Sequence, residues 1–111
     1  MRALVLRGPR QFAVEDVPVP TTLDPDDVLC KVHTTFICGT DPHIINGDFP
    51  GFWPPAFPFI PGHEWSAEVV RVGSAVKGLG VGDRVVGECV IGQEHFGFSI
   101  SGAAAEYFVA K

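Results

Sequence analysis

Short apolar segments separated by glycine- and proline-rich turns run along the whole chain. In the clearest segment, Ser66–Val72, successive side chains fall on alternate faces of a strand, with Ala67 and Val69 on one face and Glu68 and Val70 on the other. The pattern predicts six strands in all, which are Ala3–Arg7, Phe12–Val17, Val28–Thr34, Ser66–Val72, Arg84–Val90 and Ala104–Val109.

No segment carries a long apolar stripe at helical spacing. Gly39–Ile45 predicts a short helix, because Thr40 or Asp41 could cap its N-terminus and Pro42 suits a first turn. Many short strands joined by Gly/Pro turns favour a sandwich or a partly open barrel. We therefore expect an all-β fold with one or two short helices.

Residues 49–61 contain five prolines, which predict a stiff, extended loop. The aromatic side chains of this loop need an apolar surface on which to pack. Phe52 and Trp53 could line a substrate channel, and they could equally form an apolar lid over the core.

Composition narrows the class of protein. A chain of 111 residues that is 46% hydrophobic can form one domain with a packed core. The net charge is -5 and no basic cluster stands out, which argues against nucleic acid and anionic membrane surfaces as partners. The sequence shows neither a membrane span nor a signal peptide, so we expect a cytoplasmic protein. Three irregularly spaced cysteines make a disulfide framework improbable.

Side chains that can bind metals occur in three groups, which are Cys38–His43, Gly62–Glu64, and a weaker group of Glu88, Cys89, Glu94 and His95. Zinc favours thiolate, imidazole and carboxylate ligands. Cys38 and His63 are 25 residues apart, so only the fold could bring them together. Spacing alone therefore leaves a zinc site as one possibility among several.

Four motifs follow one another along the chain, which are Cys38–His43, Pro61–Glu64, Val81–Val85 and Ala105–Val109. In order and spacing they resemble the motifs of the zinc-dependent medium-chain alcohol dehydrogenase family. The resemblance covers residues 1–111 and implies the GroES-like catalytic domain of that family, a partly open β-barrel.

The resemblance also implies roles for six residues. Cys38 and His63 would ligate a catalytic zinc ion, and Glu64 would lie beside it. Asp41 would accept a hydrogen bond from the ligand imidazole and fix its tautomer. Catalytic roles would fall to two further residues, with Thr40 touching the hydroxyl of a small alcohol substrate and His43 passing its proton to solvent. The zinc ion would polarise the alcohol, which then gives hydride to NAD(P).

Simpler explanations exist for the same residues. Cys38 could be a small buried hydrophobe and His63 a hydrogen-bonded core residue. Glu64 could form a structural ion pair, Asp41 could simply cap the helix, and His43 could be an exposed loop residue. Three other side chains predict no chemistry: Cys30 is expected in the core, Cys89 is expected to be structural, and His33 is expected on a strand surface.

The chain departs from the family pattern in two respects. Residues 89–102 lack the Cys-x-x-Cys run that binds a structural zinc ion in many relatives, and we hypothesise that this lobe was deleted. We also expect no cofactor-binding Rossmann domain within residues 1–111, since Gly78, Gly80 and Gly82 have the wrong spacing for a dinucleotide turn. Since the third protein ligand of the zinc usually comes from beyond residue 111, we expect the isolated chain to be inactive.

Two alternatives to an enzyme fragment remain at this point. One is a non-enzymatic GroES-like scaffold or engineered domain fragment, and the other is a zinc-free reductase relative. We also expect a homo-oligomer that forms through the exposed interdomain face, with the loop Phe49–Phe59 and free strand edges driving association.

Overall fold

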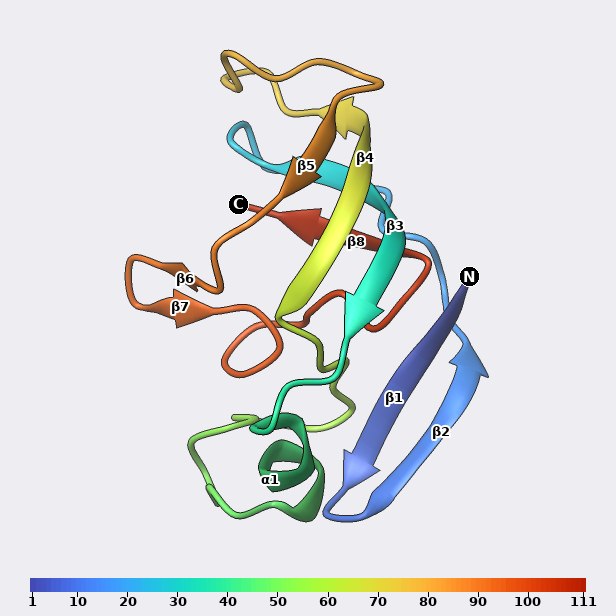
Figure 1. Ribbon diagram of the computed structural model, residues 1–111, viewed down its shortest axis with the longest axis vertical. Helices are drawn as coiled ribbons and strands as arrows, with labels where there is room; N and C mark the ends of the chain where they lie inside the picture. The colour runs from blue at the N-terminus through green and yellow to red at the C-terminus, as the bar shows by residue number, and fades with distance from the viewer.

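A four-stranded antiparallel sheet dominates the computed structural model, which describes residues 1–111. The strand order is β5 (Arg84–Val86), β4 (Glu64–Val72), β3 (Val28–Phe36) and β8 (Tyr107–Ala110). Two hairpins and one helix surround the sheet (Figure 1), and these are β1 (Arg2–Gly8) with β2 (Gln11–Asp16), β6 (Val90–Ile91) with β7 (Glu94–His95), and α1 (Asp41–Asn46). The sheet does not close on itself, so the predicted all-β, GroES-like, partly open architecture is confirmed.

Two predicted strands differ in extent from the observed ones. The strand predicted at Arg84–Val90 ends at Val86, and Val90 pairs instead with His95 in the β6–β7 hairpin. The strand predicted at Ala104–Val109 begins only at Tyr107. The preceding residues bind elsewhere: the Ala104 N–H donates to the Pro61 carbonyl at 2.9 Å instead of to a sheet neighbour.

Helix α1 begins one turn after β3 and is short, as its sequence predicts. Pro42 lies in the first turn, and Gly47 ends the helix in the left-handed region at φ 78°. Of the two capping residues considered, Thr40 or Asp41, it is Thr40 that occupies the N-cap position, but its side chain makes no capping hydrogen bond. Its backbone is already helical, with φ -82° and ψ -24°, so the hydroxyl is not aimed at the first free N–H groups.

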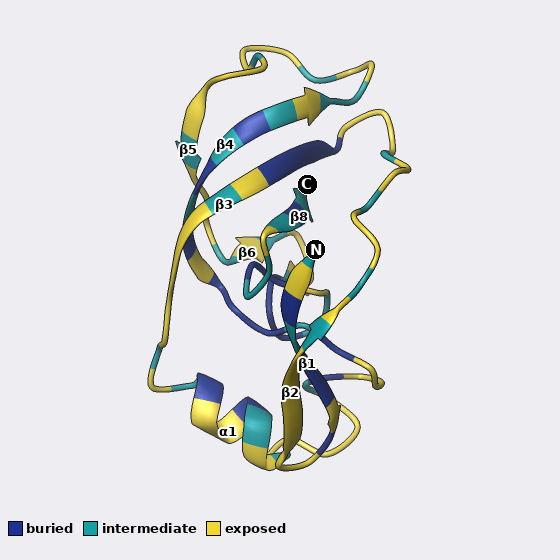
Figure 2. Cartoon of the chain, turned by 90° about the vertical axis from the view of Figure 1, so that its right-hand side faces the viewer, coloured by how far each residue is buried: buried dark blue, intermediate teal, exposed yellow.

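Two apolar cores hold the fold together (Figure 2). The sheet core consists of Val28, Cys30, Trp65, Ala67, Val69, Phe96, Ala103 and Phe108. The helix core lies between β1 and α1 and consists of Leu6, Ile44, Phe59 and Phe98. Each large side chain buried in this way contributes roughly 1.5–3 kcal/mol to stability. The core position predicted for Cys30 is confirmed, and His33 lies on the strand surface as expected.

The proline-rich loop is bent rather than extended, contrary to the prediction. Its first part turns back on itself, because Gly51 adopts φ 74° and the Trp53 N–H donates to the Phe49 carbonyl at 3.0 Å. The turn places the Trp53 ring against Phe98 of the helix core, at a centroid distance of 5.2 Å.

The structure contains no helix with the length and hydrophobicity that a membrane span requires.

Candidate metal centre

The pairing of β3 with β4 brings the two halves of the metal centre together. Phe36 at the end of β3 lies opposite Glu64 at the start of β4. Cys38 follows Phe36 by two residues and His63 directly precedes Glu64. The potential ligand atoms of Cys38, His63 and Glu64 all lie within 4.8 Å of one another. The fold thus supplies the proximity that 25 residues of sequence separation left open.

The three side chains differ in their access to solvent. The His63 ring is buried, the Cys38 thiol is half-buried, and the Glu64 carboxylate is exposed. Together they offer sulfur, nitrogen and oxygen donors, a set that suits zinc. The carboxylate is therefore the member of the cluster that is most open to solvent.

Asp41 contacts two of the three cluster residues. Its Oδ2 accepts a hydrogen bond from the Cys38 backbone N–H at 2.7 Å. Its Oδ1 lies 3.5 Å from His63 Nδ1, and both side chains are only 8% exposed. Neither Oδ1 nor Nδ1 has another hydrogen-bond partner in the protein. Because buried polar atoms are costly when unpaired, these two atoms favour each other as donor and acceptor.

With the proton on Nδ1, His63 Nε2 on the far side of the ring carries a lone pair, which accepts a hydrogen bond from Thr40 Oγ1 at 3.4 Å. The Thr40 hydroxyl is therefore adjacent to the cluster. His43 lies apart from it, with its Nδ1 2.7 Å from Asp48 Oδ2 and its ring exposed to solvent. The structure therefore brings together five of the six residues singled out in the sequence, and His43 is connected to them only through α1.

An aromatic wall lies beside the cluster, and of its members the Phe98 ring was not identified from the sequence. The Phe98 ring packs on the His63 ring at a centroid distance of 4.6 Å. Trp53 packs on Phe98, and His95 and Phe49 pack on Trp53 at 5.7 and 5.5 Å. Trp53 thus belongs to a wall that connects the helix core with the cluster. Phe98 was missed because a single phenylalanine in an irregular segment has no periodicity to mark it.

A second thiol lies close to the cluster without belonging to it. Burial raises the pKa of the Cys89 thiol, and the neighbouring Cys38 raises it further. The Cys89 Sγ is 3.8 Å from the Phe96 carbonyl, and the residue packs against the helix core. Cys89 is not among the residues whose potential ligand atoms lie within 4.8 Å of one another.

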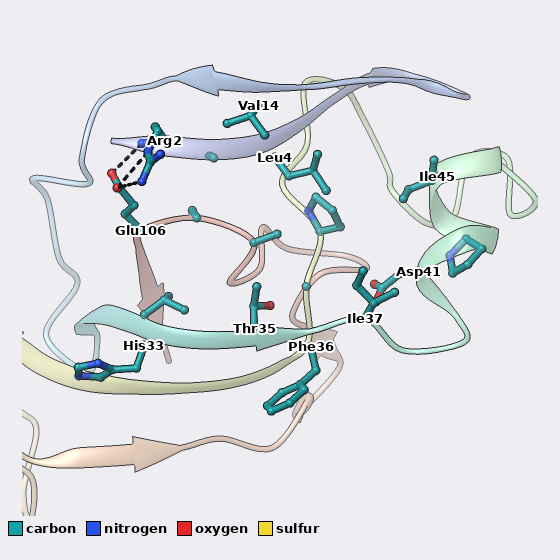
Figure 3. Close-up of a pocket in the computed structure, with 17 residues that line it drawn as sticks. Arg2, Leu4, Val14, His33, Thr35, Phe36, Ile37, Asp41, Ile45 and Glu106 are labelled. Carbon is teal, nitrogen blue, oxygen red and sulfur yellow. Dashed lines mark hydrogen bonds and ion pairs between the residues drawn. The ribbon is translucent and has the colours of Figure 1, made fainter.

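The largest pocket, with a volume of about 590 Å³, lies next to the cluster but does not contain it. We call it the apolar groove, and its apolar lining includes Leu4, Val14, Phe36, Ile37 and Ile45. Figure 3 shows the β1–β2 hairpin on one side and β3 on the other, with the Arg2–Glu106 ion pair at one end and α1 at the other. Asp41 lines the groove, but none of the three cluster residues does.

Comparison with known proteins places this fold and these motifs among dehydrogenases. Residues 24–111 match the family model of the alcohol dehydrogenase GroES-like domain. An L-threonine 3-dehydrogenase from Protochlamydia amoebophila (strain UWE25) is 37% identical over 113 residues, covering 86% of this chain and 33% of the relative. The zinc-type alcohol dehydrogenase B of Aspergillus flavus is 41% identical over 103 residues, covering 86% of this chain and 23% of the relative.

The similarity extends to solved structures. A Sinorhizobium meliloti 1021 protein solved with bound NADP superposes with a TM-score of 0.85 at 31% sequence identity. That match covers 97% of this chain and 35% of the other protein. The chain therefore spans about a third or less of the length of the proteins it matches.

Proposed function

This chain belongs to the alcohol dehydrogenase GroES-like domain family, and we propose that it is the metal- and substrate-binding part of a zinc-dependent alcohol or polyol dehydrogenase that uses NAD(P). The observation that carries the proposal is the cluster of Cys38, His63 and Glu64, whose potential ligand atoms lie within 4.8 Å of one another. The relatives act in one case on threonine and in another on an alcohol, so we leave the substrate at the level of a small alcohol.

The donor set of the cluster fits zinc in kind, since thiolate and imidazole are common ligands of catalytic zinc ions. Cys38 and His63 would hold the ion, with Glu64 as a third, exposed oxygen donor. A bound zinc ion would act as a Lewis acid that favours loss of the hydroxyl proton of the alcohol, and the hydride on the carbinol carbon would then pass to a nicotinamide. Because the resemblance puts the third protein ligand of the family beyond residue 111, these three residues and a water molecule would hold the ion with reduced affinity.

The remaining residues act on protons and on orientation. Asp41 Oδ1 faces His63 Nδ1 at 3.5 Å and would hold the ring proton on that nitrogen, which leaves Nε2 unprotonated for the cation. Thr40, beside Nε2, offers a hydroxyl that can accept a hydrogen bond from a substrate alcohol and begin a relay, in which it gives up its own proton as it receives the alcohol's. His43 is exposed, and when its Nδ1–H donates to Asp48 its Nε2 is free to accept a proton at the surface.

We propose that residues 1–111 form a single catalytic domain and that hydride transfer requires a nicotinamide-binding domain outside it. The support is that the chain covers only 33% and 23% of the two relatives named above. We therefore expect the purified 111-residue chain to show no NAD(P)-linked oxidation of alcohols. Turnover that follows the concentration of this chain would contradict the proposal.

Metal binding tests the proposal directly. The purified chain is titrated with Co²⁺, a spectroscopic substitute for zinc, and its thiolate charge-transfer absorption is recorded. We expect the wild type to bind one Co²⁺ per chain and to show a thiolate band. Cys38→Ala should remove the band and weaken binding at least about 100-fold. Loss of an outer partner of a metal ligand already weakens binding by up to about 100-fold, so loss of a ligand should cost at least as much.

Cys89→Ala is the matched control, because it removes a nearby thiol that lies outside the cluster. It should bind Co²⁺ as the wild type does and keep the thiolate band. A wild-type chain that binds no Co²⁺ would favour the alternative of a scaffold without a metal function.

We also propose that the chain self-associates through the apolar groove. Three residues that line the groove are strongly exposed, Val14 at 69%, Phe36 at 58% and Ile37 at 88%. Contiguous apolar surface of this kind is typical of a site that is covered by protein. In a solution of the purified chain, the protein that can cover the apolar groove is a second copy of the chain.

A further inference from the structure

The loop that carries His63 packs against residues 96–104, which lie more than 30 residues later in the sequence. We call residues 96–104 the buttress segment. Three backbone hydrogen bonds join the two, from the N–H groups of Gly102, Ala103 and Ala104 to the carbonyls of Ile60, Gly62 and Pro61, at 2.7, 2.9 and 2.9 Å. These bonds end at the residue directly before His63. The backbone position of His63 therefore depends on a segment that supplies none of the cluster residues.

Glycines make this contact unusually close. Gly62 adopts φ +100°, and a Cβ at Gly62 would lie 2.7 Å from the Ala104 nitrogen. A Cβ at Gly97 would lie 2.7 Å from the Gly62 nitrogen, and one at Gly102 would overlap the Gly62 carbonyl oxygen. Two backbones in direct contact leave little room for the loop to shift, because atoms at van der Waals distance cannot approach further.

The buttress segment also fixes the ring of His63. Phe98 is 8% exposed, and its ring centroid lies 4.6 Å from that of His63. Phe98 is itself held in the helix core with Ile44 of α1. Since α1 also carries Asp41 opposite His63 Nδ1, the imidazole has packed or polar neighbours that favour one orientation.

We propose that Phe98 is a positioning residue for His63, so that the buttress segment controls metal affinity without contributing a ligand. The part of this inference that concerns metal rests on the proposed function. An imidazole free to rotate about its Cβ–Cγ bond must be ordered when a metal binds, and a preset ring avoids that loss of entropy. Outer contacts of metal ligands typically affect affinity 10- to 100-fold.

Phe96 offers a matched control for a purely structural role. It lies two residues from Phe98 in the same segment and is 1% exposed, but it belongs to the sheet core. Its ring contacts Phe108, at a centroid distance of 5.8 Å, and no contact with the His63 ring is found. Phe96→Leu therefore removes a buried ring from the segment and leaves the packing on His63 intact.

The experiment compares the wild type with Phe98→Leu and Phe96→Leu, with Phe98→Met as a second variant that keeps more side-chain volume should the leucine variant unfold. Two quantities are measured on folded protein: the Co²⁺ dissociation constant, and the ring ¹⁵N chemical shifts of His63 in the metal-free chain, which report its tautomer. We expect Phe98 variants to weaken Co²⁺ binding about tenfold. We also expect their His63 shifts to move from one tautomer toward an average, while Phe96→Leu changes neither quantity.

The inference is overturned if the Phe98 variants keep the wild-type His63 shifts, or if Phe96→Leu alters them as strongly. A wild-type chain that binds no Co²⁺ would refute the proposed function instead. In that case the ¹⁵N shifts of the metal-free chains still decide whether Phe98 orients His63.

Discussion

At the scale of single residues, Cys30 shows how burial couples stability to pH. Its side chain is 1% exposed in the sheet core, and burial raises the pKa of the thiol from 9.0 to about 11. Between these values the unfolded chain has lost the thiol proton while the folded chain keeps it. The unfolded state then binds fewer protons, so stability falls as the pH rises through this window and is unaffected below it.

We expect this residue to cost about 2 kcal/mol of unfolding free energy between pH 9 and pH 11. Cys30→Val, which fills a similar volume without an ionisable group, should lose this part of the pH dependence. Urea unfolding of both proteins at pH 8, 9, 10 and 11 measures it, because the other groups that titrate are common to both. If the unfolding free energies of the two proteins depended on pH in the same way, Cys30 would not be the source of this pH dependence.

Some residues of the site could be identified from the sequence, and others could not. Cys38, Asp41 and His63 stand in motifs whose residue types suit a metal, and the fold brings them together. Phe98 could not be identified, because its contact with His63 depends on the close glycine packing of residues 62, 97 and 102. Three glycines scattered over forty residues carry no pattern that reveals a shared contact.

At the scale of elements, Gly73 joins the end of β4 to the turn before β3. Its N–H donates to the Asp27 carbonyl at 2.7 Å, and a Cβ at this position would overlap the carbonyl oxygens of Asp24 and Pro25. A clash with backbone cannot be relieved by a rotamer change, so one of the two elements must move.

We therefore expect Gly73→Ala to destabilise the fold by about 1–3 kcal/mol, the usual cost of overpacking. Gly80→Ala in the same β4–β5 connection is the control. The nearest atom to a Cβ there is Asp83 Oδ2 at 3.9 Å, and its change in stability should stay within about 0.5 kcal/mol. Chemical denaturation measures both, and equal stabilities would contradict the role given to Gly73.

The elements themselves were predicted well where alternation decided them and poorly where contacts did. β1, β3 and β4 match their predicted ranges to within two residues at each end. The late start of β8 follows from the hydrogen bond of the Ala104 N–H to the Pro61 carbonyl, which is a long-range contact. Local sequence cannot report such contacts, since they form only once distant segments have met.

At the scale of the whole molecule, the apolar groove predicts how the chain behaves in solution. Burial of exposed Val14, Phe36 and Ile37 against another copy would remove apolar surface from water. We expect the wild type to associate as its concentration rises, and Ile37→Ser with Val14→Thr to shift it toward the monomer.

Light scattering coupled to size exclusion measures this shift across a range of concentrations. Val81→Thr is the control, because Val81 is 70% exposed but lies in the β4–β5 connection and does not line the groove. A wild-type chain that stays monomeric at high concentration would rule out association through the groove.

The two tryptophans of the chain lie in different parts of the structure, so their fluorescence reports on different regions. Trp65 is 6% exposed in the sheet core against Phe108, whereas Trp53 packs on Phe98 and thus lies one ring away from His63. The intrinsic fluorescence of Trp65 therefore reports the packing of the sheet. In a Trp65→Phe chain, the remaining emission comes from Trp53 alone and follows events beside His63 without any added label.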